Sequence, residues 1–226
     1  DWTWLLLGLT LVSPSLTLFV SFLDVTSYPF SLGWSEGNRL WDYSILFGHD
    51  RYNYPGDQEI PVFLDASRQF IGGIPFLVPE VTIAEVRLWL ALVEIVPYLI
   101  LGWITFRLTR EKWAPWILAG IWAFTFVRQG PIHPPLLICA IVVALAWQRP
   151  LVLAIPMLFV ASYFAGASRL TWLFAPAMWS VMLEFASAPA LNTSVWRRSI
   201  SVGVAGLLGG YLLPAYLPGI IASITS

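Results

Sequence analysis

The sequence predicts an all-α membrane protein: a polytopic transmembrane helical bundle of about seven spans, with a long outward first loop that contains interfacial helices. Three observations lead to this prediction. The mean hydropathy is +0.74 and only 11% of the residues are charged, whereas charged residues make up about a quarter of typical soluble domains. Apolar runs recur at lengths near the ~20 residues that cross a bilayer, and Lys and Arg gather in alternate connections between them.

Apolar runs that could span a membrane occur seven times along the chain. They are 4–23, 83–106, 113–127, 134–148, 151–166, 170–186 and 199–223. The first run has no basic segment before it and no A-x-A cleavage site, so we expect a retained helix rather than a signal peptide. In the last run, Gly206-x-x-x-Gly210 favours close helix packing. We treat residues 1–226 as one transmembrane domain, trimmed or incomplete at its ends because Asp1 stands in place of Met.

Basic residues indicate which connections face the cytoplasm, because Lys and Arg are retained on that side of a membrane. The alternate connections that carry them contain Arg107, Arg110, Lys112, Arg149, Arg197 and Arg198. The amino terminus is then cytoplasmic and the first loop, 24–82, is extracytoplasmic. Arg128 and Arg169 fall on the outward side, where this rule gives no reason for a basic residue.

The first loop is rich in both charge and aromatic residues, as in "LGWSEGNRLWDYSILFGHDRYNYPGDQE", residues 32–59. Long ordered loops are usually functional, and this composition is too aromatic for a disordered segment. A short amphipathic helix is expected to begin near Ser35 and to end at Gly48. The pattern of a second amphipathic stretch, 62–77, predicts an interfacial helix that Gly72-Gly73 and Pro75 interrupt.

The arrangement of this loop resembles a known family. A first transmembrane helix is followed by an outward loop with acid-x-x-Arg and then Gly-x-x-Arg-Tyr, here "EGNR" and "GHDRY", by two interfacial helices and by further spans. This pattern resembles the conserved module of the GT-C superfamily of glycosyltransferases, which includes oligosaccharyltransferase catalytic subunits, protein O-mannosyltransferases and aminoarabinose transferases. The resemblance covers most of the chain as architecture, but its motifs span about twenty residues.

The resemblance implies an enzyme that moves a sugar from a polyprenyl-phosphate carrier to an acceptor at the outer face. Glu36 matches the family's first-loop carboxylate by position. Many relatives show Asp-Glu or Asp-x-Asp there, whereas Gly37 and Asn38 follow Glu36. A divalent metal ion therefore stays open as a cofactor, and we assign no residue as its ligand.

Candidate catalytic and binding residues follow from the chemistry of such a transfer, which needs a base and positive charge for the departing phosphate. Glu36 is the first candidate for the base and Asp24 is its rival. The alternative for Glu36 is a solvated acid at a helix start, either favoured by the helix dipole or paired with Arg39. Asp42 is expected to be solvated or paired with Arg39. The residues that we assign to substrate or phosphate binding are Arg39, Arg128, Arg169 and His133.

Two functions remain open at this point. The first is a membrane glycosyltransferase whose partners are the lipid-linked sugar donor and membrane lipids. The second is a non-enzymatic integral-membrane subunit of a larger complex, with partner membrane subunits. The sequence contains no P-loop and no Gly-x-Gly-x-x-Gly after a strand, and the net charge of -1 gives no reason to expect nucleic acid.

Overall fold

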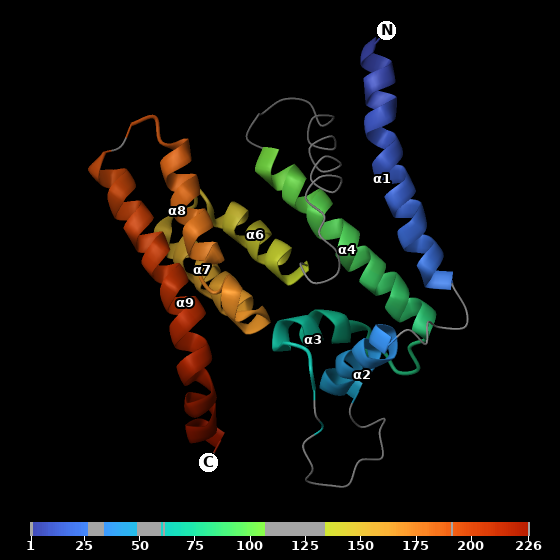
Figure 1. The fold of residues 1–226 in the computed structure, drawn as a ribbon. Helices are drawn as coiled ribbons and strands as arrows, with labels where there is room; N and C mark the ends of the chain where they lie inside the picture. Colours follow the sequence, from blue (N-terminus) through green and yellow to red (C-terminus); the bar gives the residue numbers. More distant parts are fainter. Residues whose placement is uncertain are drawn as a thin grey trace. The chain divides into compact units, whose positions relative to one another are not determined.

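The computed structural model describes residues 2–26, 34–48, 60, 62–106, 134–190 and 192–225. Within these residues all α and β structure is helical, with eight α-helices and no strand (Figure 1). The all-α prediction is confirmed. The chain divides into two compact units, Asp1–Ile132 and His133–Ser226.

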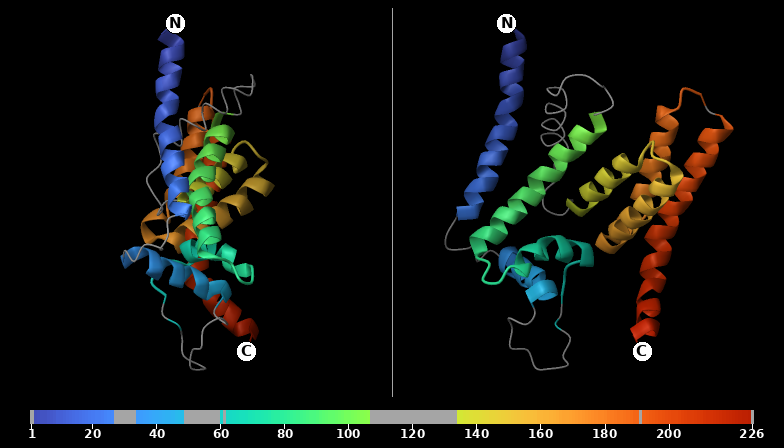
Figure 2. Two further views of the ribbon diagram at one scale, coloured as in Figure 1. Left: turned by 90° about the vertical axis from the view of Figure 1, so that its right-hand side faces the viewer. Right: turned by 180° about the vertical axis from the view of Figure 1, so that it is seen from behind.

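The first unit contains four α-helices and a short 3-10 helix. They are α1 (Trp2–Thr26), α2 (Trp34–Gly48), α3 (Ala66–Gly73), η2 (Ile74–Leu77) and α4 (Ile83–Phe106). The helix α1 packs along α4, while α2, α3 and η2 pack together near the amino-terminal end of α4 (Figures 1 and 2). The helices α2, α3 and η2 therefore all come from the predicted first loop.

A pair of glycines lets α3 approach α2 closely. A Cβ atom at Gly72 would overlap the ring of Tyr43, and one at Gly73 would lie 2.8 Å from the Tyr43 carbonyl oxygen. The sequence predicted that this pair and Pro75 interrupt the helix, and α3 does end at Gly73, where the chain tightens into η2 with Pro75 near its start. The pair also allows the close approach between the two helices.

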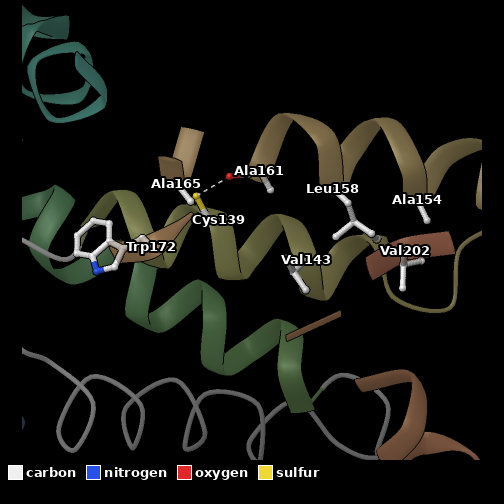
Figure 3. Packing of buried hydrophobic residues seen from close by; sticks show 9 residues of the cluster. Cys139, Val143, Ala154, Leu158, Ala161, Ala165, Trp172 and Val202 are labelled. Atoms are coloured by element: carbon white, nitrogen blue, oxygen red, sulfur yellow. Dashed lines mark hydrogen bonds between the residues drawn. The ribbon is translucent and has the colours of Figure 1, made fainter. Parts of the chain in front are cut away.

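The second unit is a small helical bundle. It consists of α6 (Pro134–Ala146), α7 (Leu151–Ser168), η4 (Leu170–Trp172), α8 (Ala175–Ser187) and α9 (Thr193–Thr225). The helix α7 contacts α6, α8 and α9. The core between them includes Val143 and Leu158, and the Cys139 thiol donates a 3.2 Å hydrogen bond to the Ala161 carbonyl (Figure 3).

The glycines of α9 are packing residues, as the sequence predicted. A Cβ atom at Gly206 would lie 2.7 Å from the Cβ of Ala177, and one at Gly210 would lie 2.7 Å from the Leu173 carbonyl oxygen. At the start of α9, the Asn192 side chain accepts a 3.0 Å hydrogen bond from the backbone of Val195, so this residue caps the helix.

The prediction of about seven membrane spans is wrong for the described part of the chain. Of the helices there, only α7 is long and apolar enough to cross a bilayer. Both α6 and α8 have 13 residues, which at ~1.5 Å per residue reach about two thirds of ~30 Å of hydrocarbon. The helix α4 has 24 residues and contains Glu85 and Arg87 near its start and Glu94 farther along. The run 113–127 lies outside the described residues.

The contact between α2 and α3 gives a test of the fold. Gly72→Ala should lower the free energy of unfolding by about 1–3 kcal/mol, the usual cost of overpacking, because the Tyr43 ring has to move. Gly37→Ala is the matched control, since a Cβ there meets nothing within 4 Å and alanine is the better helix former. Thermal denaturation of the two variants checks this, and equal melting temperatures for both would contradict the packing described.

Candidate functional site

An ion pair between Glu36 and Arg87 forms the centre of the candidate site. Glu36 lies in the first turn of α2 and Arg87 lies near the start of α4. The Arg87 Nε is 2.7 Å from Glu36 Oε1 and an Arg87 terminal nitrogen is 3.1 Å from Glu36 Oε2. The side chains are only 10% and 20% exposed, for Arg87 and Glu36 respectively. This two-pronged geometry is the strongest form of carboxylate–arginine contact.

The start of α4, just before Arg87, is fixed by a capping box. The Thr82 hydroxyl accepts a 3.3 Å hydrogen bond from the Glu85 backbone, and the Glu85 carboxylate accepts a 2.7 Å hydrogen bond from the Thr82 backbone. These reciprocal bonds satisfy donors that a helix start leaves open. The hydrogen bonds from the Thr82 backbone and hydroxyl lower the pKa of the Glu85 carboxyl below its ordinary value.

A second set of polar side chains surrounds Tyr43 on α2. Tyr43 is buried, and burial raises the pKa of its hydroxyl, while the positive charges of Arg68 and Arg39 oppose the shift. Arg68, from α3, also hydrogen-bonds the Tyr43 side chain, and Glu94, from α4, lies close enough to act on it electrostatically. Charged side chains from α2, α3 and α4 therefore meet around one protonated phenol.

Asp42, next to Tyr43, is buried rather than solvated. Its side chain is 2% exposed, and its Oδ2 accepts a 3.3 Å hydrogen bond from the Phe63 backbone. The Gln69 side chain donates a 3.0 Å hydrogen bond to the Asp42 carbonyl oxygen. The expectation of a solvated Asp42 is wrong because α3 and the residues before it cover this face of α2.

The other residues predicted for the site are distributed as follows. Arg39 lies on α2, three residues after Glu36, whereas Arg169 belongs to the second unit and follows α7. Arg169 is exposed, and its guanidinium lies 5.9 Å from the centre of the Trp172 ring. Asp24 lies near the end of α1, but its side chain is not described. Arg128 and His133 lie outside the described residues.

Sequence reasoning missed Arg87 because this residue falls inside the apolar run 83–106. The signal was present: Arg87 is a basic residue at the outward end of a predicted span, the same feature that drew attention to Arg128 and Arg169. A second pair was also missed, between Arg198 of α9 and Glu184 of α8, with 2.8 Å between nitrogen and oxygen. The sequence analysis placed Arg198 in a cytoplasmic connection and did not pair it with an acidic residue.

The second unit contains a small cavity beside Glu184, also lined by Ser180, Trp147 and Leu158. Its volume of about 10 Å³ is near the space that one water molecule needs, so a sugar does not fit there. Among the described residues, no three His, Cys, Asp or Glu side chains are grouped so that they could hold a metal ion.

Comparisons of the chain with protein-family models, with curated proteins and with solved structures find no match. The geometry of the site is thus the basis for a functional assignment. It consists of a paired carboxylate, several arginines and a protonated phenol on three helices that pack together.

The capping box gives a pH-dependent prediction. Because the pKa of Glu85 is lowered from 4.5 in the folded protein, its contribution to stability is present above pH 4.5 and is lost as the pH falls through the lower folded value. Glu85→Gln should therefore lower the melting temperature at neutral pH and flatten its decline at acidic pH. Glu80→Gln, at a nearby exposed acid, is the control and should leave this pH profile unchanged; an identical profile for Glu85→Gln would contradict the capping role.

Proposed function

We propose that this protein is a membrane glycosyltransferase that moves a sugar from a polyprenyl-phosphate carrier to an acceptor hydroxyl, with segment 24–82 on the outer face and the amino terminus in the cytoplasm. The observation that carries the proposal is the Glu36–Arg87 pair, because it places a carboxylate beside a phosphate-binding type of side chain. The membrane location is supported by the hydropathy of the chain and by α7 as a candidate span.

The proposed reaction assigns one role to each partner of this pair. The acceptor oxygen forms a bond to the anomeric carbon of the sugar while the bond from that carbon to the phosphate oxygen breaks. Glu36 takes the proton from the acceptor hydroxyl, and the polyprenyl phosphate leaves with the electron pair of the broken bond. Arg87 stabilises the negative charge that grows on this phosphate.

Arg87 engages both oxygens of Glu36, so this carboxylate has to be released from the ion pair before it can act as a base. The fork of an arginine fits a phosphate as well as it fits a carboxylate. A donor phosphate that binds Arg87 competes with Glu36 for the same nitrogen atoms. Donor binding therefore frees Glu36 to accept a proton, and the enzyme without donor keeps its base bound.

Arg39 is a further phosphate-binding candidate, because it lies one helical turn after Glu36 on α2. Arg169 lies in the second unit and stays a proposal of the sequence. Arg128, His133 and Asp24 stay proposals of the sequence, because the structure does not describe their side chains.

The alternative function is that of a non-enzymatic subunit in a membrane complex. One observation favours it: both oxygens of Glu36 are engaged by Arg87, as in a purely structural strut between two helices. Exposed apolar side chains such as Val152 and Leu170 fit a partner subunit as well as they fit lipid. The two functions differ in what Glu36 does beyond holding α2 to α4.

The catalytic role of Glu36 can be separated from its role in the fold by exchanging the charges of the pair. Glu36→Gln should reduce sugar transfer by about 10²–10⁴-fold, the usual contribution of a general base. The double variant Glu36→Arg with Arg87→Glu restores an ion pair between the same helices. We expect it to recover the melting temperature lost in the single Glu36→Arg variant without recovering transfer, measured with a polyprenyl-phosphate sugar in detergent or nanodiscs.

The control is Glu80→Gln, which removes an exposed acid outside the pair. Full transfer by Glu36→Gln would exclude Glu36 as the base, and in that case Asp24→Asn identifies whether the rival carries the reaction. Full transfer by the charge-exchanged protein would assign the pair to structure alone, whereas a wild-type protein without transfer activity would support the subunit.

A further inference from the structure

The second unit carries most of its charge at one end. Its sequence, His133–Ser226, contains four arginines, one glutamate and no lysine or aspartate. Arg149 lies between α6 and α7, and Arg197 and Arg198 lie in the first two turns of α9. We call these three residues the arginine end of the unit.

Arg198 holds the parts of the arginine end together. Its Nε lies 2.8 Å from Glu184 Oε1 on α8, and one of its terminal nitrogens donates a 2.7 Å hydrogen bond to the Arg149 carbonyl oxygen. The indole of Trp147 donates a 3.3 Å hydrogen bond to the Ser187 hydroxyl at the end of α8. The connection between α6 and α7 is therefore fixed against α8 and α9, and Arg198 neutralises the one glutamate of the unit.

Arg149 and Arg197 supply the net positive charge of the arginine end. Both residues are exposed, and within the described residues no acidic side chain pairs with either of them. Two helices begin here and two end here, so their dipoles act in opposite directions. The two arginines therefore set the charge of this surface, and an anion is the kind of ligand that it fits.

Exposed apolar residues begin directly beside these two arginines. On α7, Val152 follows Arg149 closely and is 83% exposed. On α9, Ile200 and Val204 follow Arg197 at spacings that place them on the same face of the helix, and both are exposed. Two helices thus pass from charge to exposed apolar surface within about two turns, as at the boundary between the headgroups and the acyl chains of a membrane.

Trp196 lies at the same boundary. Its ring packs edge to face on Phe185, with 4.9 Å between the ring centroids, yet the residue is 50% exposed. Tryptophan is enriched at membrane–water interfaces, because its ring is apolar and its N–H is polar. An acidic protein partner would match the arginines but would not account for the exposed apolar residues of α7, a helix that is long and apolar enough to cross a bilayer. The observations favour lipid.

We propose that the arginine end binds the headgroups of anionic membrane lipids, with Arg149 and Arg197 at the level of the lipid phosphates and the apolar residues of α7 and α9 along the acyl chains. The inference rests on the proposed membrane location and not on sugar transfer. Basic side chains at a membrane surface are attracted to anionic lipids, and arginine can reach the headgroups while its stem lies on apolar surface. Bound lipid then holds α7 and α9 at one depth, because Arg198 joins their starts.

The test counts the lipids bound to the purified full chain by native mass spectrometry. Phosphatidylglycerol and phosphatidylcholine are added in separate titrations, because both contain a phosphate but only the first has a net negative charge. We expect the wild-type protein to bind phosphatidylglycerol about fivefold more tightly, the scale of one arginine near an anionic surface. Arg149→Gln with Arg197→Gln should reduce this preference to near unity, whereas Arg149→Lys with Arg197→Lys keeps the charge and should keep the preference.

The melting temperatures of both double variants should stay close to that of the wild-type protein, since neither arginine is buried. If the glutamine double variant fails to fold, the single variant Arg197→Gln decides, and its preference should fall. A wild-type protein that binds both lipids equally overturns the inference and leaves the arginines to an acidic partner protein. An unchanged preference in the folded glutamine variant overturns it too, because other basic residues then bind the lipid. The proposed function fails separately, when the wild-type protein prefers phosphatidylglycerol but transfers no sugar.

Discussion

The two-pronged contact between Glu36 and Arg87 is the constraint on which the candidate site depends. It joins α2 to α4 across 51 residues of sequence, and both partners are mostly buried. Removing one partner of such a pair leaves an uncompensated charge, which costs about 3–5 kcal/mol. The pair therefore fixes the position of α2, and through α2 it fixes Arg39, Asp42 and Tyr43.

The rest of the first unit supports this contact at both ends. The capping box at Thr82 and Glu85 sets where α4 begins, so that Arg87 lies one turn from a fixed point. On the other side, the glycine pair of α3 allows Tyr43 to pack against the backbone, which brings Arg68 to the phenol. Stability and the proposed chemistry thus use the same residues, and a change to either helix start should affect both.

Helix positions could be predicted from the sequence, whereas membrane spanning and side-chain pairing could not. The run 83–106 matches α4, and Gly48 ends α2 as expected, because apolar periodicity and glycine act locally. The number of spans was overestimated because hydropathy of a run does not reveal where the helix ends or how its ionisable residues are placed. Arg87 was missed and Asp42 was misjudged because their partners lie 51 and 21 residues away in the sequence.

The central claim is that the donor phosphate takes Arg87 from Glu36. The most direct measurement is a structure of the protein with polyprenyl-phosphate sugar bound, compared with one determined without it. We expect the guanidinium of Arg87 to lie within hydrogen-bond distance of the phosphate oxygens and the Glu36 carboxylate to have moved toward the acceptor side of the sugar. A bound donor with the Arg87 Nε still 2.7 Å from Glu36 Oε1, and with the phosphate held by other residues, would contradict the claim.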